Sequence, residues 1–523
     1  MCGICGEISK TRELKNLGER IRDLMIRLQH RGQEAAGALV SDGYNVTPEK
    51  NFGEVIEVLS LAWALLQEGS HGIGHLRYST AGKSLVRALA KLTLGLDALS
   101  KKRALKSIPS AKNIQPFYTE SVRFGRIGLV HNGNLTNADK LKKQLQKKGV
   151  FFDADSDTEV ILKLICYYAQ KRKNSIPRAI RKAMGRMKGA YSCILMTREG
   201  LWAFRDSLGF RPLKIAETKD SFIFTSELLA CHGRETFKPK KHKANVLAGE
   251  IVEVKVGTGK LTSYPPRKKR AKRSFCIFED IYLQGFGPPK IADCRFGFGT
   301  SLFNYHPFPG IVVPIMNSGE GAALGYHYAQ NLKFPGRAFY YPALYKDPLT
   351  GRTFLAPDQK TRIAKNKRKY FPLFQSLAPM INQLAKTEKQ IWLIFIDDSL
   401  VRANTSRTLI KIIRRELKVF YPELYRRFKI AWLLSSPPIV NPCYFGIDTY
   451  DKKKLIAANK TMAQIKRSIG CSHLGYIPLE DILNVAAKVH HLKTCDFCTG
   501  CFQGGKYPIK INPKQDKMSV AKA

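Results

Sequence analysis

The sequence begins MCGICGEIS (residues 1–9), in which a cysteine follows Met1 and leads directly into an apolar run. Removal of Met1 would leave Cys2 with a free α-amino group, and at its pKa of about 7.7–8.0 such an amine is partly unprotonated near neutral pH. An unprotonated amine can take the proton of the thiol, as in other N-terminal nucleophiles. A cysteine at position 2 alone is usually without function, so the surrounding chain has to supply the rest of a site.

Several residues of the first half suit a cysteine that attacks a carboxamide. Arg77 can clamp a carboxylate through two hydrogen bonds, and Asp157 can bind an ammonium group. Asn132 and Gly133 offer a side-chain amide and a backbone N–H to a developing oxyanion. Each has an ordinary alternative, because HNGN is an acceptable turn and SDTE is a good helix N-terminus. Their combination indicates one site instead of separate accidents.

The expected pattern of secondary structure changes near residue 260. In the first half, short apolar runs bounded by turn residues predict the strands of a mixed sheet system. In the second half, strands at 311–315 and 391–396 are each followed by a polar loop and a helix. This order predicts a parallel sheet that binds ligands at the carboxyl ends of its strands. The expected helices cover 17–28, 157–170, 322–331 and 406–418.

The same patterns divide the chain into five segments. We predict an N-terminal domain (2–256), a basic linker containing RKKRAKR (257–274), an α/β domain (275–465), a helical closing segment (466–512) and a disordered tail (513–523).

Charge and composition narrow the class of protein. The chain has 87 Lys and Arg against 42 Asp and Glu, a net charge of +45. The basic residues are spread along the chain and no nucleic-acid-binding motif accompanies them, so we predict no nucleic-acid partner. No apolar run is long enough to span a bilayer and no signal peptide is seen, which predicts a cytoplasmic protein without a membrane partner.

Seven motifs of the first half occur together and in order: MCGICGE (1–7), QHRGQEAAG (29–37), GIGHLRYSTAG (72–82), QPFY (115–118), LVHNGNLTN (129–137), SDTE (156–159) and FRDSLGFRPL (204–213). They resemble the glutaminase domain of the N-terminal-nucleophile amidotransferases. The resemblance implies a four-layer αββα sandwich in which Cys2 is the nucleophile and Asn132 and Gly133 form the oxyanion hole. It also implies that Arg77, Asp157 and Arg31 hold glutamine. Residues 83–113 exceed the family's usual spacing, and we expect a surface insertion there.

The motif IFIDDSLVRANTS (394–406) resembles the phosphoribosyltransferase signature, most closely that of the amidophosphoribosyltransferases, which open purine synthesis. Two carboxylates after a buried strand can hold the ribose hydroxyls, and the following helix N-terminus can bind the 5′-phosphate. The family's reaction converts glutamine, phosphoribosyl pyrophosphate (PRPP) and water to 5-phosphoribosylamine, glutamate and pyrophosphate. The resemblance implies Mg²⁺ near Ser318, Asp397 and Asp398. The implied PRPP-binding residues are Asp397, Asp398, Ser399, Arg402, Ala403, Asn404, Thr405, Ser406, Arg352 and Lys369.

Some positions depart from the family pattern. The chain has Met-Asn317-Ser-Gly where Pro-Asp-Ser-Gly is usual, and Arg-Ala403-Asn404-Thr-Ser where Arg-Gly-Thr-Thr-Ser is usual. A glycine at position 403 would permit a positive φ or a close phosphate approach. These departures motivate an alternative hypothesis, a regulator that senses PRPP or nucleotides with a decayed transferase site.

Four of the twelve cysteines match the iron–sulfur ligands of some family members, namely Cys276, Cys443, Cys498 and Cys501. Four thiolates suit either a [4Fe–4S] cluster or zinc, and the resemblance favours the cluster. The resemblance further implies a homo-oligomer and purine nucleotides as inhibitors.

Overall fold

The computed structural model describes residues 2–78, 111–121, 124–171, 174–235, 244–266, 273–285, 287–346 and 370–511. Contacts divide the chain into two compact units. The first comprises Met1–Phe275, Cys443–Tyr450 and Tyr507–Ala523, and the second Cys276–Pro442 and Asp451–Lys506. Most of the predicted insertion, the central part of the predicted linker and the predicted tail (513–523) lie outside the described residues.

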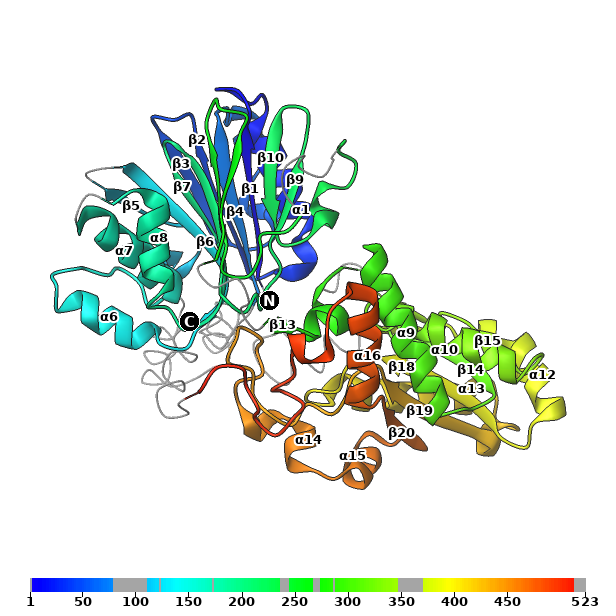
Figure 1. Cartoon of the computed structure of the whole chain (residues 1–523). Helices are drawn as coiled ribbons and strands as arrows, with labels where there is room; N and C mark the ends of the chain where they lie inside the picture. The colour runs from blue at the N-terminus through cyan, green and yellow to red at the C-terminus, as the bar shows by residue number, and fades with distance from the viewer. Residues whose placement is uncertain are drawn as a thin grey trace, which may run out of the picture. The chain divides into compact units, whose positions relative to one another are not determined.

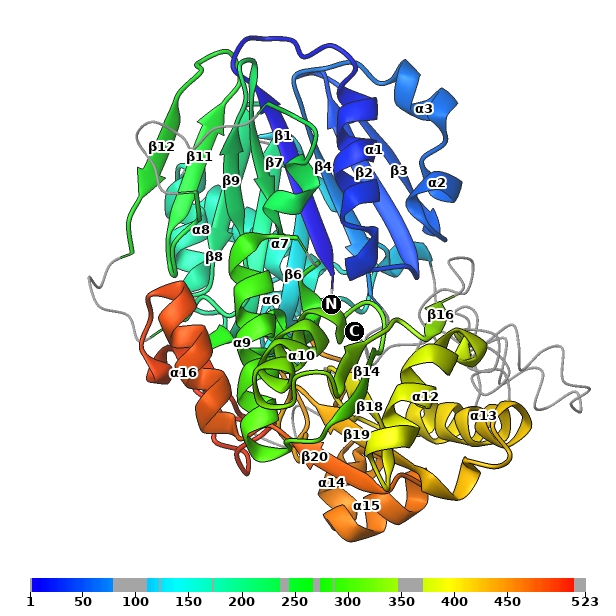
Figure 2. The ribbon, with the colours of Figure 1, turned by 90° about the vertical axis from the view of Figure 1, so that its right-hand side faces the viewer.

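Two six-stranded antiparallel sheets form the centre of the first unit (Figures 1 and 2), in the orders β3-β2-β4-β1-β10-β9 and β12-β11-β8-β7-β6-β5. The strands are β1 (Gly3–Ser9), β2 (Ala35–Ser41), β3 (Val46–Phe52), β4 (His71–Arg77), β5 (Phe117–Ser121), β6 (Gly125–Leu135), β7 (Gly189–Thr197), β8 (Gly200–Arg205), β9 (Lys214–Glu217), β10 (Ser221–Thr225), β11 (Ile251–Lys255) and β12 (Leu261–Tyr264).

Strand β1 is buried on both faces, which explains its continuous apolar sequence. Ile4 and Ile8 pack between the two sheets, against residues such as Val130 and Ile194 of the second sheet. Cys5 points the other way, toward helix α1, because side chains alternate along a strand. The start of β1 is therefore held in place from both sides.

Helices cover the outer face of each sheet. In α1, Leu17, Ile21, Leu24 and Met25 recur at helical spacing and form one buried stripe. On the other side, helices α6 to α8 pack on the second sheet. The predicted four-layer αββα sandwich is thereby confirmed. The helices are α1 (Leu17–Arg27), α2 (Val55–Val58), α3 (Leu61–Leu66), α6 (Ala138–Gln146), α7 (Asp157–Gln170) and α8 (Ile176–Met184), with 3-10 turns at Gln29–Arg31, Ala111–Asn113 and Leu228–Cys231.

A five-stranded parallel sheet forms the centre of the second unit, in the order β15-β14-β18-β19-β20. Ile311, Val313, Leu393 and Phe395 share a core with helices α12, α13 and α15. The alternate residues point to the opposite face, which α10 covers, with α9 and then α16 packed beyond it. This confirms the predicted parallel sheet with helices on its faces.

The strands and helices of the second unit alternate in the predicted order of strand, loop and helix. The sheet strands are β14 (Gly310–Pro314), β15 (Ala338–Tyr340), β18 (Ile391–Asp397), β19 (Phe428–Leu434) and β20 (His473–Tyr476), and the small pairs are β13 (Phe275–Cys276) with β21 (Phe497–Cys498) and β16 (Leu344–Lys346) with β17 (Tyr370–Pro372). The helices are α9 (Pro289–Tyr305), α10 (Glu320–Lys333), α12 (Ala378–Thr387), α13 (Asn404–Phe420), α14 (Ile456–Asn459), α15 (Met462–Ile469) and α16 (Leu479–His490), with a π-helix at Glu279–Leu283.

The structure differs from the predicted segments in three places. Part of the predicted linker is strand β12, which pairs with β11. The closing segment expected to be helical also supplies β20, the last strand of the parallel sheet. Residues Cys443–Tyr450, predicted within the α/β domain, group with the first unit. Within the described part of the chain, none of the helices is both long and apolar enough to cross a membrane.

Candidate active site

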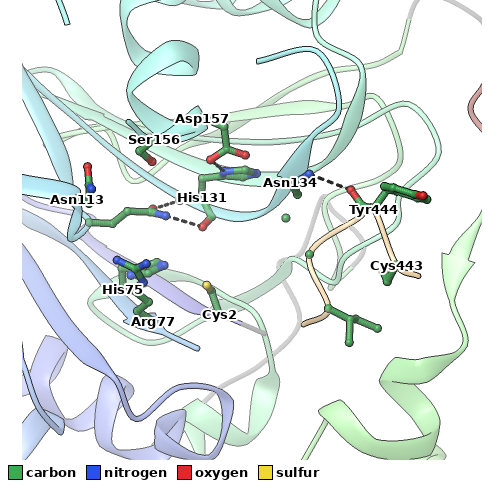
Figure 3. A pocket seen from close by; sticks show the side chains of 14 residues that line it. Cys2, His75, Arg77, Asn113, His131, Asn134, Ser156, Asp157, Cys443 and Tyr444 are labelled. Carbon is green, nitrogen blue, oxygen red and sulfur yellow. Dashed lines mark hydrogen bonds and ion pairs between the residues drawn. The ribbon is translucent and has the colours of Figure 1, made fainter. Parts of the chain in front are cut away.

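A cavity of about 60 Å³ opens beside Cys2 at the start of β1 (Figure 3). By the same measure a single water needs about 10–15 Å³, so the cavity has room for a small molecule. It brings together four residues predicted for the glutaminase site, Cys2, Arg77, Gly133 and Asp157. The other residues of its wall are His75, Asn113, Gln115, His131, Asn134, Ser156, Cys443, Tyr444, Gly446 and Ile447.

Arg31, predicted to hold glutamine, is not part of this wall. Its buried guanidinium donates from Nε to the carbonyl of Cys2 at 3.0 Å and forms an ion pair with Glu227. Although burial raises the pKa of Glu227, the charge of Arg31 and the bond from His30 hold it at about 2. The carboxylate thus stays ionised and anchors the arginine that positions the backbone of Cys2.

Arg77 and Asp157 place opposite charges on the cavity wall. Arg77 ends strand β4 and lies 3.4 Å from Glu34. Asp157 begins helix α7 and accepts the N–H of Leu135 at 2.9 Å. Burial alone would raise the pKa of Asp157, but the nearby His131 and backbone N–H donors lower it. A cation and an anion on one wall match the carboxylate and ammonium ends of a free amino acid.

Two histidines of the wall were present in the motifs but were given no role from sequence. Burial, followed by the charges of Arg77 and His131, lowers the pKa of His75 well below its usual value. His75 is therefore neutral at neutral pH. His131 lies with Nδ1 3.6 Å from Asp157 and 3.3 Å from Thr158 Oγ1, so it helps to orient the carboxylate. His75 directly precedes Leu76-Arg77 and His131 directly precedes Asn132-Gly133. This position beside predicted site residues was the sequence signal that could have identified them.

Strand β6 carries the predicted oxyanion hole. Asn132 is fully buried, and neither its amide nitrogen nor its amide oxygen has a hydrogen-bond partner. Leaving a buried polar group unpaired costs about 1–3 kcal/mol, so a ligand oxygen that accepted from this amide would recover that energy. The neighbouring Gly133 has φ of 150°, and a Cβ there would lie 2.0 Å from the carbonyl oxygen of Ala190. Glycine is required at this position.

The wall also contains a segment from the second half of the sequence, Cys443–Tyr450. The carbonyl of Tyr444 accepts from Asn134 Nδ2 at 2.9 Å (Figure 3), and that of Phe445 accepts from Arg211 at 2.7 Å. The ring of Phe445 stacks on Phe210 at 4.4 Å. The sequence analysis assigned a role only to Cys443 in this segment, as a metal ligand, so its contribution to the cavity was missed.

In the second unit, two strand ends bring the predicted magnesium residues together. Ser318 follows β14 and donates its hydroxyl to Asp398, which follows β18. Asp398 is buried and Asp397 is half-buried, and the N–H of Asp398 bonds to the Asp397 carboxylate at 2.9 Å. Oxygen ligands of this kind are those that Mg²⁺ prefers.

The predicted phosphate loop leads into helix α13. Ser399 and Arg402 lie in the loop, and Asn404, Thr405 and Ser406 form the first turn of the helix. Ala403 is the residue before that turn, and its φ of 57° and ψ of 17° are left-handed. The structure therefore confirms that position 403 has the backbone conformation for which a glycine is suited. Arg352 and Lys369 lie outside the described residues.

Of the four matching cysteines, three are buried and Cys501 is partly exposed. Cys276 and Cys498 lie on the paired strands β13 and β21. The carbonyl of Cys501 accepts from the N–H groups of Val440 and Asn441, at 2.9 and 3.0 Å. Cys443 belongs to the first unit and the other three to the second.

An N-terminal-nucleophile sandwich with this cavity, on the same chain as a parallel α/β unit whose carboxylates gather at strand ends, defines a glutamine amidotransferase that carries a phosphoribosyltransferase-like unit. Comparison with known proteins agrees. A family model described as a glutamine amidotransferase domain matches residues 102–232.

Relatives that match over nearly the whole chain identify the particular family. The amidophosphoribosyltransferase of Methanocaldococcus jannaschii is 32% identical, with 98% of each chain covered. The structure of the PRPP amidotransferase from Bacillus subtilis complexed with ADP and GMP matches with a TM-score of 0.75, at 26% identity and 98% coverage of each chain. A second structure, described as the allosteric regulatory enzyme of purine biosynthesis, matches with a TM-score of 0.77, at 27% identity and 100% and 99% coverage. The chain belongs to the amidophosphoribosyltransferase family, glycosyltransferase-type enzymes of the first step of purine synthesis.

Proposed function

We propose that this chain makes 5-phosphoribosylamine and pyrophosphate from PRPP and ammonia, and that Cys2 releases the ammonia from glutamine. The cavity beside Cys2 carries the proposal, because it combines a thiol with a cation and an anion that suit an amino acid. Glutamine would place its α-carboxylate at Arg77 and its α-ammonium at Asp157.

The thiol of Cys2 would transfer its proton to the free α-amino group and attack the carboxamide carbon. The amide of Asn132 and the N–H of Gly133 would stabilise the oxyanion, and the unpaired Asn132 amide suits this role. Ammonia leaves as the thioester forms, and water then releases glutamate and the free thiol.

In the second unit, Asp397 and Asp398 would hold the ribose hydroxyls, and the first turn of α13 would bind the 5′-phosphate. Ser318, Asp397 and Asp398 would hold Mg²⁺, which supplies positive charge to the departing pyrophosphate. Ammonia would then bond to C1 of the ribose.

Two further proposals rest on the family. Cys276, Cys443, Cys498 and Cys501 would hold a [4Fe–4S] cluster that stabilises the fold, with zinc as the lesser alternative. Since a solved relative is complexed with ADP and GMP, we also propose that purine nucleotides bind this chain and regulate it.

Replacing the nucleophile tests the glutaminase assignment. Cys2→Ala should abolish glutamine-dependent formation of phosphoribosylamine and leave ammonia-dependent formation intact. The matched control is Cys5→Ala, a buried cysteine of strand β1 that faces α1, which should retain both activities. Glutamine use by Cys2→Ala at the wild-type rate would overturn the assignment.

A measurement of pyrophosphate release distinguishes the proposed transferase from the alternative, a regulator that senses PRPP or nucleotides. With PRPP, Mg²⁺ and glutamine, robust release supports the enzyme. Glutaminase activity without pyrophosphate would instead favour the regulator with a decayed transferase site, which the positive φ of Ala403 motivates.

A further inference from the structure

A second constellation of metal-binding side chains lies in the second unit, apart from the four matching cysteines. Asp280, Cys294 and His490 each offer one donor atom, and these atoms all lie within 4.8 Å of one another. Among the described residues, no other group of three or more His, Cys, Asp or Glu side chains converges in this way.

The three residues come from three elements that pack together. Asp280 is in the π-helix Glu279–Leu283, Cys294 is in the second turn of α9, and His490 ends α16. Helices α9 and α16 lie side by side (Figures 1 and 2). A ligand held by all three would tie the segment after Cys276 to the helix that precedes Cys498.

The geometry suits a metal better than a proton relay. His490 Nε2 lies 3.0 Å from Asp280 Oδ2 and 3.7 Å from Cys294 Sγ. A relay would present a different ring nitrogen to each partner, whereas here one nitrogen faces both. Zinc bonds of about 2.0–2.3 Å in a tetrahedron place an imidazole nitrogen about 3.3 Å from an oxygen and about 3.5 Å from a sulfur. The observed separations are close to both values.

Burial supplies an independent observation. Asp280 and Cys294 are both 0% exposed, and Asp280 Oδ1 has no hydrogen-bond partner. A buried carboxylate oxygen without a partner is costly unless it is paired or coordinates a metal. The side chain of His490 is 18% exposed, which leaves a path from solvent.

We propose that Asp280, Cys294 and His490 bind a structural Zn²⁺ ion. Thiolate and imidazole donors select zinc over magnesium or calcium, and one thiolate with one carboxylate balances its two positive charges. On binding, the thiol proton of Cys294 leaves to solvent as the sulfur–zinc bond forms. Water would complete the tetrahedron. The site contains none of the four matching cysteines and does not depend on the proposed reaction.

Metal analysis of the full-length chain tests the proposal. After loading with Zn²⁺ and removal of loosely bound metal by a weak chelator, the wild type should retain one zinc per chain. Cys294→Ser and His490→Gln should each reduce this at least tenfold without changing the iron content. The matched control is Cys471→Ser, a buried thiol of the same unit outside the constellation, which should retain zinc.

The possible outcomes separate the alternatives. Zinc absent from the loaded wild type, or retained by both variants, overturns the proposal. Zinc lost from Cys498→Ser but not from Cys294→Ser overturns it too, because the metal then belongs to the other cysteines. If Cys294→Ser does not fold, His490→Gln decides, since this side chain is partly exposed at a helix end. In Co²⁺-loaded protein, a thiolate-to-cobalt absorption band should be present in the wild type and absent from Cys294→Ser.

Discussion

Ala403 offers the sharpest test of the transferase unit, because it directly precedes helix α13, whose first turn is the proposed phosphate site. The residue is 4% exposed and has a left-handed backbone with φ of 57°. We predict that Ala403→Gly strengthens PRPP binding while leaving the stability of the protein almost unchanged.

Three terms contribute to the stability of Ala403→Gly. Relief of the left-handed conformation stabilises the folded chain by roughly 1–2 kcal/mol. The greater freedom of glycine in the unfolded chain costs about 0.4–1 kcal/mol, and loss of the buried methyl group costs about 0.8 kcal/mol. The sum lies within about 1 kcal/mol of zero, so the midpoint of thermal unfolding should move by only a few degrees.

The effect of Ala403→Gly on the affinity for PRPP contains no opposing contributions of this kind. With glycine at position 403 the left-handed backbone before α13 is no longer strained, so the N–H groups at the start of the helix can adjust to the phosphate. One better charge-assisted hydrogen bond contributes about 1.5–3 kcal/mol, so the Kd for PRPP should fall about tenfold or more. Isothermal titration with PRPP and Mg²⁺ measures this change in the full-length chain.

The matched control is Ala486→Gly, in the buried face of helix α16. It should leave the Kd for PRPP unchanged and destabilise the protein by about 2 kcal/mol, because a helical backbone gains nothing from glycine. An unchanged or weaker affinity of Ala403→Gly for PRPP would refute the idea that the strained backbone at position 403 limits phosphate binding. A loss of stability equal to that of Ala486→Gly would refute the strain argument.

Two other predictions concern the glutaminase unit. Glu227→Gln should lose on the order of 3 kcal/mol of stability at neutral pH, since the folded pKa is about 2 and the unfolded value is near 4.3. The folded pKa is the lower of the two, so the stabilisation by Glu227 is present above about pH 4 and is lost as the pH falls toward 2. The free energy of unfolding, measured across that range, should therefore fall in the wild type but not in Glu227→Gln. An equal pH dependence of the two proteins would contradict the prediction. Phe445→Ala should cost about 3–5 kcal/mol of stability, because its buried ring stacks on Phe210. It should lower glutamine-dependent more than ammonia-dependent activity in a steady-state assay; equal losses would show that the loop does not support the cavity.

Much of the fold follows from local patterns. The predicted helix at 157–170 matches α7 (Asp157–Gln170), because Ser156 caps a run of apolar residues at helical spacing. The strand at 391–396 was visible for a similar reason, since a strand buried on both faces is apolar throughout. Strand β12 was missed because its four residues are mostly polar and it pairs only at the edge of its sheet.

For the candidate site, too, some features were predictable from the sequence and others were not. The sequence by itself predicted that Cys2, Arg77, Asp157 and Gly133 belong to one site, because the predicted chemistry requires the particular atoms of these residues. Only the tertiary structure decided that Arg31 holds the backbone of Cys2 instead of lining the cavity. It alone decided that the segment beginning at Cys443 completes the cavity wall. Contacts between residues so distant in the chain depend on how whole sheets and loops pack, and no local spacing of residues encodes that packing.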